Sequence, residues 1–258
     1  MRDVHIHLER GEYTLQWVEK FIEQARATGL DEIYLLEHSH RFWEFSEMYE
    51  PVKAYNQYQR EWFCQKKIKS IHEYIDLIDK LRKLEFPIKV QFGLEVCYFP
   101  GKEDLIASVL KTYNWDFVTG SVHYMDGWGF DHQAEFWQGV DVDQAYRRYY
   151  QIMLELIHSG LFTGLAHPDS IKCFGHYPSY DLTETYKGLA QALNRADMYA
   201  EQSGGLALNH GFGELGLNPK MLKVLKENQV RILTASDAHR PEHVGANIQT
   251  LQQSLSRG

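Results

Sequence analysis

Asp3-Val4-His5-Ile6-His7, close to the start of the chain, is the first β-strand that the sequence predicts. His5 and His7 are two residues apart, so both side chains point to the same face of that strand. A pair of this kind is as often a satisfied polar pair as a metal site. The residues that stand at the ends of the other strands decide between these two interpretations.

The chain alternates short β-rich runs with longer amphipathic stretches, which predicts a parallel sheet wrapped by helices. Six further strands are predicted at Glu32–Leu36, Ile88–Leu94, Asp116–Val122, Leu161–Ala166, Gly205–Leu208 and Val230–Ala235. Helices are predicted at Leu15–Thr28, Glu61–Leu84, Ile106–Tyr113, Tyr146–His158, Tyr180–Gln202 and Asn247–Ser256. The sequence contains no linker, repeat or low-complexity stretch, so we expect one domain over residues 1–258. Seven βα-like units fit an α/β fold with a closed or nearly closed barrel, and a doubly wound open sheet also fits the pattern.

The composition, with 44% hydrophobic and 24% charged residues, is typical of a soluble globular protein. The net charge of −8 argues against a protein that tracks phosphodiester backbones, so we expect no nucleic-acid partner. The three cysteines form no CxxC pair, which excludes a disulfide framework and a thiolate zinc site. The chain also has no run long enough for a membrane span and no signal-peptide pattern at its start, so we expect a cytoplasmic protein without a membrane partner.

Each predicted strand ends at residues that can ligate a metal or form strong hydrogen bonds. These residues are His5 and His7, Glu37 and His38, Glu95, His123, His167, Asn209 and His210, and Asp237 and His239. In an α/β barrel the carboxyl ends of all strands meet at one mouth, where active sites are built. One strand that ends in such a residue is weak evidence, but seven strands that all carry one at the carboxyl end favour a metal centre.

The charges of this set favour more than one metal ion. Imidazoles crowded together would otherwise have to stay neutral and find partners, while Glu95 and Asp237 would be partly buried anions. A tetrahedral zinc uses about four ligands, so eight or nine candidates suggest two or three ions bridged by a carboxylate. Nitrogen and oxygen ligands without sulfur fit zinc, manganese or iron, and the sequence does not choose among them.

Six motifs along the chain resemble those of the PHP (polymerase and histidinol phosphatase) family, within it the histidinol-phosphatase-like branch. They are Asp3-Val-His5-Ile-His7, Glu37-His38-Ser-His40, Gly93-Leu-Glu95-Val, Gly120-Ser-Val-His123, His167-Pro-Asp and Ser236-Asp237-Ala-His239. They occur in order over nearly the whole chain. The resemblance implies a distorted (β/α)7 TIM-like barrel with a trinuclear metal centre, in agreement with the seven predicted strands.

The resemblance also implies a set of ligands for each metal ion. One ion would be held by His5, His7, Glu95 and Asp237, and a second would share Glu95 and add His123 and His167. A third would be held by His38, His239 and a residue from the loop after the first strand. Many relatives supply a histidine in that loop, whereas this chain reads Leu-Glu-Arg-Gly-Glu-Tyr. We expect Glu9 to take that place, with Glu12 as the second choice.

A phosphomonoesterase is the activity that the resemblance implies, with L-histidinol phosphate in histidine biosynthesis as the expected substrate. Hydroxide formed from water between two ions would attack phosphorus in line, and Glu95 and Asp237, the expected catalytic residues, would hold the ions and orient the nucleophile. Candidate phosphate-binding residues near strand ends are Arg10, Arg41, Lys172, His176, His210 and Arg240. Each is equally well interpreted as a solvated charge or part of a loop salt bridge. Some relatives place an arginine after the sixth strand, where this chain offers no cation except His210.

The loop from Asp126 to Gly139 has two interpretations. Its Trp128, Asp131, His132 and Trp137 are candidates for recognising an amino alcohol such as histidinol. The same residues also suit an aromatic lid that packs on the barrel rim.

Three alternative functions fit parts of the pattern. A phosphoesterase acting on nucleotides or another small phosphorylated metabolite would use the same fold, although the acidic balance disfavours nucleotides. A metal-dependent C–N hydrolase usually carries a carboxylated lysine as the bridge, whereas Glu95 is the natural bridge here. A non-catalytic role in metal storage or regulation is the third. The partner that we expect is a small phosphorylated metabolite.

Overall fold

The computed structural model describes residues 1–256, and seven parallel strands form its centre. Their order in the sheet is β1-β2-β3-β4-β7-β8-β9, and each pairs in parallel with its neighbour. Their bounds are β1 (Arg2–His7), β2 (Glu32–Leu36), β3 (Lys89–Cys97), β4 (Phe117–Ser121), β7 (Gly164–Leu165), β8 (Tyr199–Ser203) and β9 (Ile232–Ala235).

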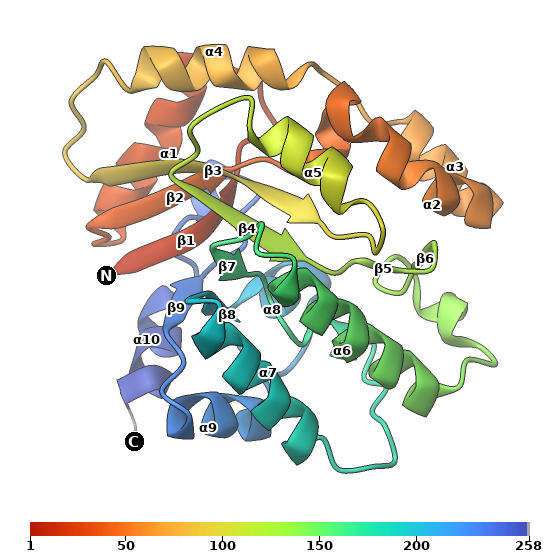
Figure 1. The fold of residues 1–258 in the computed structure, drawn as a ribbon. Helices are drawn as coiled ribbons and strands as arrows, with labels where there is room; N and C mark the ends of the chain where they lie inside the picture. Colours follow the sequence, from red (N-terminus) through yellow and green to blue (C-terminus); the bar gives the residue numbers. More distant parts are fainter. Residues whose placement is uncertain (257–258) are drawn as a thin grey trace.

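The two edge strands of this sheet approach each other and nearly close it (Figure 1). Ile6 pairs with Ala238, just beyond β9, and the His7 amide donates to the Ala238 carbonyl at 2.8 Å. The predicted distorted (β/α)7 barrel is therefore confirmed, and the open doubly wound sheet is excluded.

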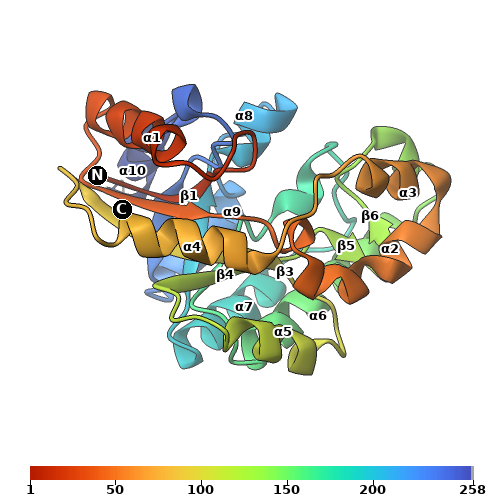
Figure 2. The ribbon, with the colours of Figure 1, turned by 90° about the horizontal axis from the view of Figure 1, so that it is seen from above.

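The helices surround the strands, as the view from above shows (Figure 2). Their bounds are α1 (Leu15–Ala27), α2 (Glu50–Tyr55), α3 (Gln57–Cys64), α4 (Ile71–Leu81), α5 (Glu103–Leu110), α6 (Val142–His158), α7 (Thr183–Arg195), α8 (Gly205–His210), α9 (Pro219–Glu227) and α10 (Ile248–Ser256). Most bury one apolar face against the barrel: in α4 the buried positions Ile71, Tyr74, Ile75 and Ile78 recur at helical spacing. None of the helices within residues 1–256 is long and apolar enough to cross a membrane.

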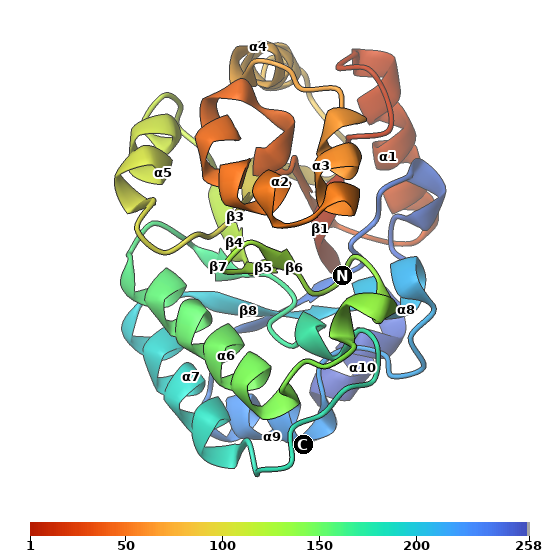
Figure 3. The same cartoon turned by 90° about the vertical axis from the view of Figure 1, so that its right-hand side faces the viewer.

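The single helix predicted over Glu61–Leu84 is two helices, α3 and α4. Ser70 begins the second one with a capping box, in which its side chain and that of Glu73 satisfy the free amide groups of the first turn. Helices α2 and α3 lie beside a small hairpin of β5 (Tyr124–Met125) and β6 (Trp128–Gly129) (Figure 3). Gln59 joins the two parts, because its side chain donates to the Gly127 carbonyl and accepts from the Gly129 amide.

The sixth strand of the barrel is not where the sequence predicted it. Gly205–Leu208 lies in helix α8, and the strand is β8, which the prediction had assigned to the end of a helix. Helix α7 ends at Arg195, and Asp197 then adopts a left-handed backbone with φ of 52° that turns the chain into β8. Asn209 and His210 consequently stand at the end of a short helix rather than at the end of a strand.

Candidate metal centre

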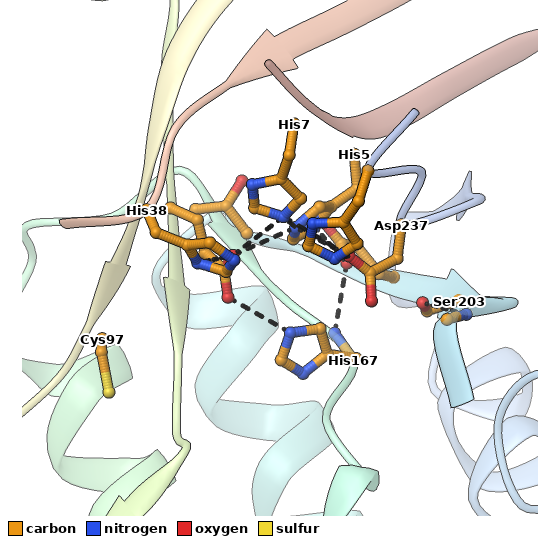
Figure 4. Close-up of polar contacts among 12 residues, drawn as sticks. His5, His7, His38, Cys97, His167, Ser203 and Asp237 are labelled. Carbon is orange, nitrogen blue, oxygen red and sulfur yellow. Dashed lines mark hydrogen bonds and ion pairs between the residues drawn. The ribbon is translucent and has the colours of Figure 1, made fainter. Parts of the chain in front are cut away.

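Glu95, at the carboxyl end of β3, is the centre of a buried cluster of imidazoles. Figure 4 shows His5, His7, His38 and His167 of this cluster. Its Oε2 lies 2.8 Å from His38 Nδ1, 3.2 Å from His5 Nε2 and 3.3 Å from His7 Nε2. Its Oε1 lies 3.0 Å from His123 Nε2 and 3.3 Å from His167 Nε2. The two oxygens of one carboxylate therefore face two different groups of histidines, as a bridge between two cations requires.

Asp237 is the second carboxylate of the cluster and follows β9. Its Oδ1 lies 3.3 Å from His239 Nε2, 3.4 Å from His7 Nε2 and 3.7 Å from His5 Nε2. Asp237 and His167 both have a left-handed backbone, with φ of 57° and 27°. Such conformations cost energy in non-glycine residues and concentrate at functional sites.

The donor set fits divalent cations. Within residues 1–256, three groups have ligand atoms that all lie within 4.8 Å of one another: His7 with His38 and His239, His5 with Glu95 and His167, and His5 with His7 and Asp237. Ligands at the usual zinc–nitrogen distance in a tetrahedron are roughly 3.3 Å apart, close to the separations in this cluster. Imidazole and carboxylate donors suit zinc, manganese and iron. Cys97 lies apart from the converging side chains (Figure 4).

The electrostatics of the cluster also favour a cation. Burial by itself would raise the pKa of Glu95, but His38 and His5 together with hydrogen bonds from His123 and His167 hold it well below its usual range. Burial would likewise lower the pKa of His123, yet Asp131 and Glu95 raise it to about 10. The buried carboxylates therefore draw positive charge to themselves. Divalent ions supply that charge and displace protons from the imidazoles.

Of the two candidates in the loop after β1, the structure brings Glu9 to the cluster. Its Oε1 lies 2.9 Å from His239 Nδ1. Glu12 is exposed and pairs with Lys69 at 3.0 Å, so the structure does not bring this second choice to the cluster.

Two carboxylates that contact the cluster histidines were not predicted in that position. Glu201, on β8, lies 2.9 Å from His5 Nδ1. Asp131 lies 2.7 Å from His123 Nδ1, although the sequence suggested it as a substrate-recognition residue. Glu201 was missed because its segment was assigned to a helix, and no motif distinguishes it from a surface acid.

A pocket of about 260 Å³ opens beside the cluster. Its walls are mainly aromatic and histidine side chains, and it reaches the cluster at His38 and His123. The other lining residues are His40, Tyr49, Tyr58, Trp62, Cys97, Tyr124, Asp131, His132 and His210. Of the six candidate phosphate-binding residues, only His210 is among them, on the exposed end of α8.

The structure corrects the prediction for Lys172. This side chain is buried, and its ammonium group is 2.8 Å from Asp169 Oδ2, 2.8 Å from the Gly216 carbonyl and also bonded to Glu214. An ammonium group has three donors, and all three are taken. Lys172 therefore ties two loops together and has no donor left for phosphate.

The remaining four candidates lie outside this pocket. Arg41 is largely buried, and its Nη2 donates to the Glu9 carbonyl at 3.3 Å. Arg10 and Arg240 line a separate, open hollow with Trp17. His176 stacks on Trp137 with ring centroids 4.7 Å apart.

The tryptophans of the segment from Asp126 to Gly139 are packed rather than free. Trp128 and Trp137 are both buried, with ring centroids 5.0 Å apart, and Trp137 Nε1 donates to the Phe130 carbonyl at 2.8 Å. This favours the packed lid over direct recognition by the tryptophans. His132 of the same loop does line the pocket.

Comparisons with known proteins agree with this geometry. The model of the PHP domain family matches residues 3–204. A Deinococcus radiodurans protein named "Probable histidinol-phosphatase" is 35% identical over 191 residues, which cover 69% of each chain. A Listeria monocytogenes protein of known structure superposes with a TM-score of 0.76 at 19% identity, covering 97% of this chain and 99% of that one.

A second solved structure is the histidinol phosphate phosphatase of Lactococcus lactis, in complex with zinc, L-histidinol and phosphate. It superposes with a TM-score of 0.70 at 21% identity, covering 98% of this chain and 93% of that one. At these identities the two structures show the shared fold, while the family model and the Deinococcus relative show descent. The chain belongs to the PHP domain family.

Proposed function

We propose that this protein is a metal-dependent phosphomonoesterase that hydrolyses L-histidinol phosphate to L-histidinol and phosphate, a reaction of histidine biosynthesis. The observation that carries the proposal is the position of Glu95, whose two oxygens face separate histidine groups at the end of an aromatic pocket. The names of the Deinococcus and Lactococcus proteins, and the ligands of the latter, support the choice of substrate. We further infer that the cluster holds two or three divalent ions, with zinc, manganese or iron as the candidates.

Such ions, when bound, supply an acidified water and neutralise the oxygens of the phosphoryl group. The chain provides everything around them. Glu95 holds the two histidine groups at a fixed separation, and the Asp237 carboxylate, beside His7 and His239, is placed to orient the attacking water. Tyr58 and Trp62 line the pocket that would take the alcohol part of the substrate, where a flat imidazole ring can stack.

The charge of the pocket disfavours nucleotides as substrates. Among the described residues that line it, none is lysine or arginine, and Asp131 adds a negative charge. A di- or triphosphate would bring further negative charge into a pocket whose described lining offers no lysine or arginine to pair with it. The pocket suits a leaving group that is aromatic and cationic.

The test is phosphate release from a panel of phosphomonoesters that includes histidinol phosphate. We expect the wild type to prefer histidinol phosphate and Asp237→Asn and His5→Ala to lose at least 100-fold in kcat/KM. His72→Ala, at an exposed position of α4, is the matched control and should keep full activity. Equal turnover of many esters would contradict the assignment to histidinol phosphate, and hydrolysis of amides but not phosphate esters would contradict the reaction class.

A further inference from the structure

The histidines around Glu95 differ in what their outer ring nitrogens contact. His7 Nδ1 and His167 Nδ1 are buried without a hydrogen-bond partner, whereas His5 Nδ1 and His123 Nδ1 each face a carboxylate. Glu9 makes a similar contact to His239, but Glu9 is itself a candidate ligand. Glu201 and Asp131 contact the cluster only through the outer nitrogens and backbone of its histidines.

Glu201 holds ligands from two strands at once. It lies on β8 with no exposed surface, and its two oxygens are 2.9 and 3.0 Å from His5 Nδ1. Its Oε2 also accepts from the His167 amide at 3.2 Å. A carboxylate oxygen accepts hydrogen bonds, so His5 Nδ1 donates to Glu201, and Nε2 is the ring nitrogen that faces Glu95 and would bind a metal ion.

Asp131 makes the equivalent contact on the other side of Glu95. Its Oδ2 lies 2.7 Å from His123 Nδ1, while His123 Nε2 lies 3.0 Å from Glu95 Oε1. Asp131 comes from the loop after β6 and lines the pocket, so it stands between the pocket and the cluster.

We propose that Glu201 and Asp131 are positioning residues, each of which sets the affinity for a different metal ion. Glu201 acts through the His5 ring, on the Glu95 Oε2 side, and Asp131 acts through the His123 ring, on the Oε1 side. Glu201 also contacts His167, which faces Oε1, but only through its backbone amide, for which the side-chain oxygen of a glutamine is also an acceptor. Each fixes the ring orientation and tautomer of its histidine, and loss of such a partner typically weakens metal binding 10–100-fold. The inference rests on the proposed metal centre and not on the choice of substrate.

The experiment is a titration of the metal-free protein with Zn²⁺, followed by calorimetry, and with Co²⁺, followed by its visible absorption. Glu201→Gln and Asp131→Asn keep the size of each side chain and remove its charge. We expect each variant to bind one ion about 10–100-fold more weakly and the other ion normally. The double variant should bind both ions more weakly.

Two further variants serve as controls. Asp126→Asn changes a neighbouring loop acid that is paired with Arg148 at the surface, and should bind both ions as the wild type does. Glu201→Asp keeps the charge on a shorter arm and should fall between wild type and Glu201→Gln. If Glu201→Gln fails to fold, Glu201→Asp replaces it and should weaken only the ion that Asp131→Asn leaves unchanged.

The proposal would be overturned if Glu201→Gln and Asp131→Asn bound both ions with wild-type affinity. It would also be overturned if each variant bound both ions equally weakly. The readout needs no substrate. If the ions bind as expected while histidinol phosphate is not hydrolysed, the roles of Glu201 and Asp131 stand and the proposed function fails.

Discussion

At the scale of single residues, side-chain type and position relative to a strand end were enough to identify the cluster. The cluster brings together distant parts of the sequence: His5 and Asp237 are more than 200 residues apart, and Glu95 and His123 lie between them. All four meet because their strands end at the same mouth of the barrel. Ion pairs between residues far apart in the sequence could not be predicted in this way. The sequence left Lys172 open between phosphate binding and a loop salt bridge, because one of its two carboxylate partners, Glu214, is 42 residues away.

Lys172→Met tests that pairing. Removing the buried ammonium group leaves Asp169 and Glu214 without their cation, so we expect a loss of about 3–5 kcal/mol in the free energy of unfolding. Lys220→Met removes an exposed ion pair with Asp181 and should cost less than about 1 kcal/mol. Urea unfolding of both variants measures the difference. An undiminished stability in Lys172→Met, together with a raised KM for the phosphate ester, would instead favour the original phosphate-binding interpretation.

At the scale of elements, six of the seven barrel strands overlap the segments predicted for them, and β8 does not. β2 lies at its predicted residues, β1 begins one residue earlier than predicted, and β4 is one residue shorter than predicted at each end. β8 reads Tyr-Ala-Glu-Gln-Ser, and its Glu201 and Gln202 are buried because each has partners supplied by distant segments. A local pattern does not contain those partners, so the segment resembled the end of a helix.

Helix α8, which took the place of the predicted strand, approaches Asp237 closely. A methyl group on Gly205 would lie 2.2 Å from Asp237 Oδ2 and 2.7 Å from its Cβ, so Gly205→Ala must displace that carboxylate. We expect at least a tenfold loss of kcat/KM, weaker metal binding and a cost of about 1–3 kcal/mol in stability. The neighbouring Gly204→Ala is the matched control, because its methyl group would meet nothing closer than 3.5 Å. Equal activity of the two variants would contradict this account of the helix.

At the scale of the whole molecule, the cluster joins the two ends of the sheet. Its side chains come from β1 and from the segment after β9, where the barrel closes, and from β3 between them. Local sequence patterns predicted the number of strands but not this closure, which depends on the pairing of Ile6 with Ala238, over 230 residues apart. Metal binding and barrel closure should therefore be coupled.

Removal of the metal tests that coupling. An ion present at a hundred times its Kd stabilises the folded state by about 2.7 kcal/mol, which corresponds to a rise in Tm of roughly 5–10 °C in a chain of this size. We expect a chelator to lower the Tm by at least this much and added Zn²⁺ or Mn²⁺ to restore it. Glu95→Gln, which lacks the carboxylate at the centre of the cluster, should show a much smaller decrease in Tm. Scanning calorimetry with and without chelator measures the change in Tm. An unchanged Tm of the wild type would argue against coupling between metal binding and barrel closure.

The most direct measurement is phosphate release from histidinol phosphate by metal-free protein to which Zn²⁺ or Mn²⁺ is added in steps. If the buried histidines and carboxylates form a catalytic metal centre, release is negligible without metal, rises with each addition and saturates at two or three ions per chain, while Glu95→Gln stays inactive throughout. Full turnover by the metal-free protein, or equal turnover by Glu95→Gln, would contradict that claim.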